Sequence, residues 1–456
     1  MTKAATLALS LLVLAASAAR AADAPPDAVA TAPIVTLAEA LRAARAHQPL
    51  LDLARGNSVT ARGLADQVRG ALLPQVSAVG SYQIGTAAFV PQPGGATNNS
   101  TQMNGMTVMN QPSTETVHTG VELWKGAVNA NQLIYDFGET INRWKAARAA
   151  ADAVDANGRV TAAQVDFNAR SAFFIARAAK DLVGVARDTL ANQEKHLAQV
   201  QGFVEVGTHP EIDLTQAKAD RATAQLQLIN AENSYATAKA MLNQTMGVER
   251  SIDYDLSDEE MPFVPGEDGA VESLIDDAKQ GRPEMLNLRL NLKSQELGLR
   301  SARDMYWPNL GFNGFANESG PTLDRLTWNV TGTFTLSVPL LQGGAIDAQI
   351  HQAEGQVIQA RAQLETERQQ VRLDVEQARL GIRAAKAAIA AADDALANTR
   401  DRLRLAEGRY ATGVGSIIEL GDAQVALTTA AAQKVSAQYQ LYTARAQLVK
   451  ALGRVD

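Results

Sequence analysis

Four polar side chains near two breaks in the chain are the first candidates for chemistry. They are Asp213 and Gln216 after Gly207, and Glu419 and Asp422 after Gly413. The i, i+3 spacing places Glu419 and Asp422 on one face of the helix that follows its break. Clustered carboxylates attract cations. Acids at the start of a helix are also favoured by the helix dipole alone, so a purely structural role stays open.

Enzymatic chemistry has no supporting pattern in this sequence. The histidines lack the i, i+4 pairing of a zinc-protease helix, and there is no glycine-rich phosphate loop ending in Lys and Ser or Thr. Without a cysteine, the chain is expected to have no disulfide, no thiolate metal site, no cysteine nucleophile and no lipid attachment at a mature N-terminal cysteine. We therefore expect no catalysis and no cofactor. Each histidine is expected to be a solvated residue on a helix or loop: His47, His118, His196, His209 and His351.

Composition excludes a further class of function. The formal net charge is −7, and no block of Lys and Arg could follow a phosphate backbone, so nucleic-acid binding is not expected. Aromatic residues make up only 5% of the chain while alanine recurs throughout, which favours long, closely packed helices over a globular enzyme.

The N-terminus has the pattern of a signal peptide. Lys3 precedes an apolar stretch over 4–18, and small residues before Ala22 suit cleavage, so residues 1–21 are predicted to direct export. No later stretch reaches 18 uninterrupted apolar residues. A membrane-embedded part of the mature chain would therefore consist of strands.

The sequence contains two copies of one unit. Proline and glycine positions recur at matching separations, for example Gly207 with Gly413 and Gly247 with Gly453. The first repeat is predicted over 22–247 and the second over 270–453. An acidic, proline-containing linker over 248–269 is expected to be a solvated connector. A loop over 85–118, expected on the extracellular side, occurs only in the first repeat.

Each repeat predicts the order helix, strand, loop, strand, very long helix, turn and helix. Thr36 and Glu39 form a capping box at the first helix. Pro74 and Pro308 end the helices before the strands. In the strands, apolar and polar residues alternate, which gives one apolar and one polar face. The apolar face is predicted to contact lipid through Trp124, Trp328, Val330, Phe334 and Leu336.

Two proline-free stretches, Glu139–Glu205 and Ala345–Ala411, predict the very long helices. At 1.5 Å per residue each would extend for about 100 Å, a length suited to crossing a periplasm. The apolar positions of the second stretch follow a coiled-coil spacing with one four-residue slip. This seam is predicted to comprise Ile346, Ile350, Ala353, Val357, Ala360, Leu364, Val371, Val375, Ala378, Ile382, Ala385, Ile389, Ala392, Leu396, Leu403, Ala406 and Tyr410.

Four strands are too few to close a water-filled barrel, and an open sheet edge is costly in lipid. Three chains would supply twelve strands, so we predict an α+β membrane protein. In it, a trimeric twelve-stranded β-barrel is joined to duplicated long coiled-coil helical hairpins.

The chain resembles the TolC family of outer-membrane efflux and secretion channels. The resemblance covers about 36–453 and rests on the duplicated order, the turns at 134–138 and 340–344, and Tyr410 followed three residues later by Gly413. It implies a homotrimer with a twelve-stranded outer-membrane β-barrel that is continued by a periplasmic α-helical tunnel. It also implies a periplasmic end that opens on meeting an adaptor protein and an inner-membrane transporter of an efflux pump or type I secretion system.

The resemblance also implies roles for the polar residues near the breaks. Family members carry acidic rings here, so three chains would gather the carboxylates of Glu419 and Asp422 at a constriction that holds cations. Tyr410 and Asp213 occupy positions of constraining contacts in the closed state. Gly415 departs from the family, which often has an arginine there that helps to hold the channel closed.

A second function remains open from the residues. The long helices alone would also suit a periplasmic coiled-coil adaptor or structural protein lying against the membrane. Such a protein would need a lipoyl-like or small β-barrel domain and would lack strands with a lipid-ready face. The cargo is not evident from the sequence, because a passive channel follows the choice of its pump.

Overall fold

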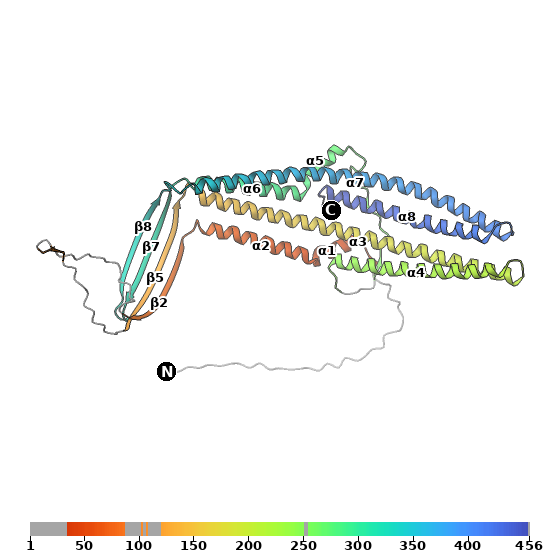
Figure 1. Cartoon of the computed structure of the whole chain (residues 1–456), viewed down its shortest axis with the longest axis horizontal. Helices are drawn as coiled ribbons and strands as arrows, with labels where there is room; N and C mark the ends of the chain where they lie inside the picture. Colours follow the sequence, from red (N-terminus) through yellow and green to blue (C-terminus); the bar gives the residue numbers. More distant parts are fainter. Residues whose placement is uncertain (1–33, 87–101, 104–105, 108–119, 250–253, 455–456) are drawn as a thin grey trace, which may run out of the picture.

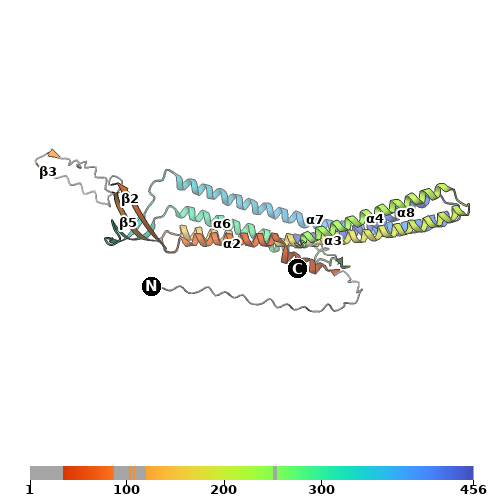
Figure 2. The ribbon, with the colours of Figure 1, turned by 90° about the horizontal axis from the view of Figure 1, so that it is seen from below.

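The computed structural model describes residues 34–86, 102–103, 106–107, 120–249 and 254–454. The described part is elongated, with the long strands at one end and the tips of two helical hairpins at the other (Figures 1 and 2). The expected signal peptide and most of the loop over 85–118 lie outside the described residues. Within that loop, β3 (Gln102–Met103) and β4 (Met106–Thr107) pair antiparallel. No helix among the described residues is long and apolar enough to cross a bilayer.

Four long strands form one antiparallel sheet in the order β2-β5-β7-β8. Their bounds are Gln75–Thr86, Gly120–Tyr135, Asn309–Gly320 and Thr327–Ser337. The two inner strands, β5 and β7, come from different halves of the sequence and pair with each other. The sheet therefore joins the two halves at this end of the molecule.

The register places apolar residues on one face across all four strands. Val330 lies opposite Ala316, which lies opposite Val128, and Phe312 contacts the Phe334 ring at 4.9 Å. Cross-strand partners project from the same face, so the alternation predicted within single strands extends over the sheet. The predicted outward side chains are mostly uncovered in one chain: Trp328 76%, Val330 65%, Phe334 70% and Leu336 66% exposed. Trp124 is half-buried beside Tyr82, with 4.3 Å between ring centroids.

Two unbroken helices, α3 (Glu139–Glu205) and α7 (Ala345–Ala411), have 67 residues each. Their bounds confirm the two predicted stretches. Both start after a glycine with positive φ, Gly138 at 110° and Gly344 at 83°, a conformation that costs other residues more. Beyond the tips, α4 (Glu211–Met246) and α8 (Ile417–Ala451) return only to the middle of the molecule (Figure 1).

The single helix predicted before each sheet is wrong, because each consists of two. These are α1 (Leu37–His47) with α2 (Pro49–Gly70), and α5 (Val271–Gly281) with α6 (Pro283–Asp304). Gln48 and Arg282 between them are extended, since a following proline disfavours the helical conformation. The predicted capping box is present, with the Thr36 hydroxyl accepting from the Glu39 backbone at 3.2 Å.

Each of these helix junctions receives the end of a returning helix. Gly247, after α4, lies against His47, and Gly453, after α8, lies against Arg282. Both glycines have positive φ, 71° and 66°. A Cβ on Gly247 would lie 2.5 Å from the His47 carbonyl oxygen, so the close approach requires glycine.

The described part of the linker is not a solvated connector, and that expectation is wrong. Its strand β6 (Asp255–Leu256) pairs in parallel with β1 (Ile34–Val35). The apolar side chains Tyr254, Leu256, Met261 and Val264 are each at most 4% exposed and join the main core. The linker packs here because its apolar residues alternate with the acids that suggested solvation.

Ion pairs attach the linker to both hairpins. Glu267 is fully buried and accepts two hydrogen bonds from Arg445 of α8, at 3.0 and 3.1 Å. Lys386 of α7 lies 2.8 Å from the same carboxylate. Burial alone would raise the pKa of Glu267, but these two cations and the Val264 N–H lower it overall. On the other side, Arg177 of α3 pairs with Asp258.

The Gly247 junction gives a stability prediction. Gly247→Ala should lower the thermal unfolding midpoint of the detergent-solubilised protein. Its methyl group meets backbone atoms, and non-glycine residues in this conformation cost roughly 1–3 kcal/mol. Gly408→Ala is the matched control, because a Cβ there has no neighbour within 4 Å and the position is helical. Equal melting of the two variants would show that the junction is not rigid.

Candidate functional site

The two hairpins reverse direction at turns that contain the predicted glycines. Gly207 and Gly413 have φ values of 81° and 74°, the left-handed conformation that ends many helices. The Thr208 hydroxyl donates to the Phe203 carbonyl at 2.9 Å and closes the first turn. Ser416 caps α8 by accepting the Glu419 N–H at 3.1 Å. Both turns lie at the same end of the molecule (Figure 1).

Tyr410 joins one hairpin to the other at this end. It lies at the end of α7, is 4% exposed, and its hydroxyl donates to Asp213 of α4 at 3.3 Å. Burial, followed by the nearby Asp213 carboxylate, raises the pKa of Tyr410 to about 12. The hydroxyl therefore remains a hydrogen-bond donor across the ordinary pH range.

A small core surrounds Tyr410. Its buried members come from all four helices of the tip: Val200, Ala217, Ala406, Tyr410, Leu420 and Ala423. Three more ring side chains flank Tyr410, with centroids 5.5 Å away for His196, 5.0 Å for His209 and 6.4 Å for Phe203. His209 also stacks on Phe203 at 4.8 Å.

The expectation of solvated histidines is wrong for His196, which is only 5% exposed. It faces the two hairpins' junction rather than water. Burial lowers the pKa of His196, while Asp220 and Asp213 oppose that change. Among the other described histidines, His47 and His351 are exposed and His209 is half-buried. His118 lies outside the described residues.

Within one chain, Glu419 and Asp422 have different surroundings. The Glu419 carboxylate pairs with Arg409 at 3.2 Å. Asp422 is exposed and has no ion pair among the described residues' salt bridges. Arg409 was not anticipated from the sequence, because it precedes the turn whereas the acids follow it. The described residues also contain no group of three or more His, Cys, Asp or Glu side chains placed to hold a metal ion.

A groove of about 600 Å³ collects the remaining polar candidates. It runs between α3, α4 and α8, and its lining includes Asp213, Gln216, Asp220 and Asp422 but no Lys or Arg. The Gln216 amide donates to Asp220 at 2.9 Å. The structure thus brings three of the four predicted polar residues to one groove and directs Glu419 toward Arg409 instead.

Gly415 fits tightly inside the second turn. Its N–H donates to the Arg409 carbonyl at 2.9 Å, and a Cβ would lie 3.0 Å from both the Arg409 Cβ and the Tyr410 nitrogen. A larger side chain would have to shift this turn. This crowding against the backbone of Tyr410 is consistent with glycine, and not arginine, at position 415.

Polar contacts between α3 and α8 extend the junction above the tip. The Gln193 amide donates to Gln424 at 2.9 Å, and both side chains are 8% exposed. One turn away, the hydroxyls of Thr189 and Thr428 lie 3.1 Å apart. Sequence reasoning missed these pairs. Polar residues recurring at buried seam positions of α3 and α8 are the only local signal for them.

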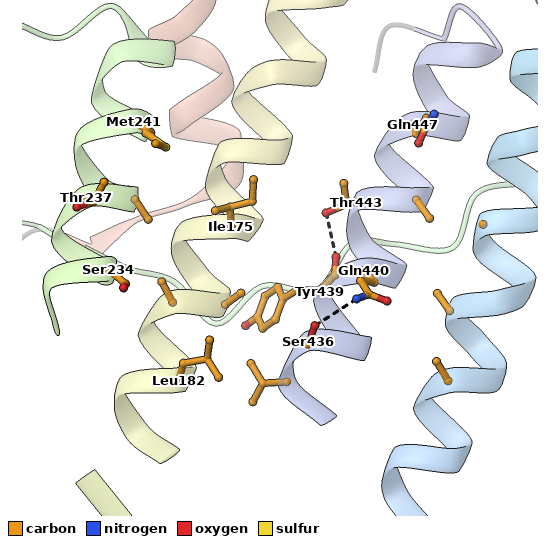
Figure 3. A pocket seen from close by; sticks show the side chains of 18 of the residues that line it. Ile175, Leu182, Ser234, Thr237, Met241, Ser436, Tyr439, Gln440, Thr443 and Gln447 are labelled. Carbon is orange, nitrogen blue, oxygen red and sulfur yellow. Dashed lines mark hydrogen bonds between the residues drawn. The ribbon is translucent and has the colours of Figure 1, made fainter. Parts of the chain in front are cut away.

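A larger hollow of about 1000 Å³ lies near the middle of the molecule, between α3, α4, α7 and α8. Its lining has no charged residue, and many of its side chains are alanines. Figure 3 shows Ile175 and Leu182 of α3 near Tyr439 of α8 on its border. This hollow therefore adds no charged group to the candidate site at the tip.

Comparisons with known proteins agree with this architecture. The model of the family described as "Outer membrane efflux protein" matches residues 40–248 and 274–454. The chain is 22% identical over 258 residues to "Probable outer membrane lipoprotein SilC" of Salmonella typhimurium, covering 55% of this chain and 53% of that protein. It therefore spans about half the length of this curated relative.

Solved structures share the whole fold. A crystal structure of CusC superposes with a TM-score of 0.79 at 17% identity, covering 92% of each chain. The open state of the Neisseria gonorrhoeae MtrE outer membrane channel gives a TM-score of 0.73 at 20% identity, covering 92% of this chain and 89% of that one. The family match over both halves of the sequence shows that the chain belongs to the outer membrane efflux protein family, and these solved structures share its fold.

Proposed function

We propose that three copies of this chain form the passive exit duct of a tripartite efflux pump or a type I secretion system. The observation that carries the proposal is the one-sided sheet continuous with two long hairpins. Strands β2 and β8 are the end strands of the four-stranded sheet. Pairing β8 of one copy with β2 of the next would close twelve strands, with the apolar face toward outer-membrane lipid.

The duct would work with two partners and no cofactor. A periplasmic adaptor would meet the helical tip, and an inner-membrane transporter would supply both the energy and the choice of cargo. The alternative of a periplasmic coiled-coil adaptor lacks support, because the family match is to outer-membrane efflux proteins and the sheet has an uncovered apolar face.

Oligomeric state tests the duct directly. We expect a homotrimer that needs detergent for extraction, because only three such sheets bring the strand number to twelve. Native mass measurement and crosslinking of the extracted protein would determine it. A stable dimer or tetramer contradicts the duct, and a monomer in the aqueous periplasmic fraction would favour the adaptor.

The contact between Tyr410 and Asp213 is proposed to hold the duct closed. It is a hydrogen bond between the hairpins at the tip, supported by the small core around Tyr410. Tyr410→Phe keeps the ring and removes this bond, worth about 1 kcal/mol per protomer. The variant should raise the open probability of the channel in planar bilayers.

Tyr306→Phe is the matched control for that measurement. Its hydroxyl also donates to a carboxylate, Asp347, at 2.5 Å, but far from the tip and close to the strands. It should leave the open probability unchanged. Equal behaviour of the Tyr410 and Tyr306 variants would remove the tip contact from the closing mechanism.

The acidic ring is the third part of the proposal. Three copies would gather the carboxylates of Asp422 and Glu419 around the entrance, where they would favour cations and bind multivalent ones. Glu419 pairs with Arg409, so Asp422 should contribute more. Asp422→Asn should therefore weaken block by periplasmic divalent cations more than Glu419→Gln does.

The double variant Glu419→Gln/Asp422→Asn completes the acidic-ring test. It preserves side-chain size and should assemble as a trimer while losing block and most of the cation preference. Single-channel recording with salt gradients measures both properties. Persistent block in these trimers would mean that the two acids only favour the start of α8.

A further inference from the structure

His196 lies at the junction between the two hairpins. It belongs to α3 of the first hairpin, and its ring meets the edge of Tyr410 of the second at 5.5 Å and 67°. It is 5% exposed, while the neighbouring Glu194 and Lys195 on the same helix are exposed. A titratable group is thus enclosed where the two hairpins contact each other.

The charged groups around His196 are unevenly distributed. From α4, Asp213 and Asp220 act on it, and Asp213 is also the acceptor of the Tyr410 hydroxyl. The one arginine of α4 near this level, Arg221, pairs with Glu194 at 3.1 Å. From α7 the ring is met by Tyr410 itself. Among the described residues, the charged groups that act on His196 are these two carboxylates, and no cation is among them.

The fourth helix of the tip, α8, contributes apolar residues to the small core around Tyr410. Leu420 and Ala423 belong to the same small core, and the acid at the start of α8, Glu419, pairs with Arg409. A proton on His196 would consequently be a buried charge whose two neighbouring acids are already engaged, Asp213 with the Tyr410 hydroxyl and Asp220 with the Gln216 amide. Protonation of His196 and the hydrogen bond from Tyr410 therefore compete for the Asp213 carboxylate.

We propose that His196 is an acid-sensitive release: its protonation weakens the contact between the hairpins and favours opening of the tip. The proposal rests on the duct function above. Once the hairpins separate, the imidazolium gains water, and Asp213 can turn toward it instead of accepting from Tyr410. Acidification of the periplasm would then favour the open duct.

The direction follows from proton linkage. Burial lowers the pKa of His196 below its ordinary value of 6.5 in the closed arrangement, and an open tip returns the ring toward that value. The closed arrangement therefore binds fewer protons, so its stability increases with pH. The contribution is complete above pH 6.5 and is lost as the pH falls from 6.5 through the lowered pKa.

Single-channel recording in planar bilayers tests this release. The open probability of the wild-type trimer should rise several-fold between about pH 7.5 and about pH 5.5, the range in which histidine titrates. His196→Gln, which cannot be protonated there, should show no rise. His351→Gln is the matched control, because the His351 side chain is 79% exposed on the distant part of α7.

Two further variants separate His196 from its neighbours. His209→Gln should retain the rise, because His209 lies in the turn and is only half-buried, so its ring is not enclosed as that of His196 is. The double variant Glu419→Gln/Asp422→Asn should also retain it, since titration of the acidic ring is then absent. Loss of the rise in either would assign the response to those residues and overturn the role of His196.

The remaining outcomes are also decisive. A wild-type channel of stable conductance whose open probability is flat or falls on acidification overturns the release and leaves the duct intact. Absence of any channel overturns the duct itself. If His196→Gln does not assemble, NMR titration of the wild-type histidines replaces it. A His196 midpoint below 6.5 supports the release, and a midpoint at or above 6.5 overturns it.

Discussion

Small side chains along α3 and α7 set how closely the helices of this chain approach one another. α3 packs against α2, α4, α6 and α8, and α7 packs against α6 and α8. Many buried positions of both helices are alanine, and the two fully buried phenylalanines of α3, Phe173 and Phe174, belong to the main core. Helices this long are stable in water mainly through such packing. The sheet at one end and the tip at the other both depend on it.

The parts that were predictable have a local periodic signal. Every buried residue of α7 belongs to the predicted seam, because burial there depends only on the spacing of apolar residues along one helix. The one-sided sheet followed in the same way from alternation within β8. The bounds of α3 and α7 were set by proline and glycine, which act on their own backbone and immediate neighbours.

The parts that were missed depend on partners distant in sequence. His196 and Glu194 lie two residues apart on one helix, yet only the packing of α7 decides that the first is enclosed and the second exposed. The acidic linker looked solvated because Arg445 and Lys386, which neutralise Glu267, lie more than a hundred residues away. Likewise, the pairing of Arg409 with Glu419 requires the exact path of the intervening turn. Composition and spacing carry no information about such encounters.

The linker's attachments also determine how the tip can move. Arg177 ties it to the first hairpin, and Glu267 ties it to the second through Arg445, all at the middle of the molecule. In the proposed duct, these ion pairs would be the pivot about which the hairpins rotate. With 36 residues, α4 alone makes an arm of about 54 Å, so a rotation of about 5° moves its far end by roughly 5 Å. Small rotations at the ion pairs would thereby become displacements of several ångströms at the tip of the proposed duct.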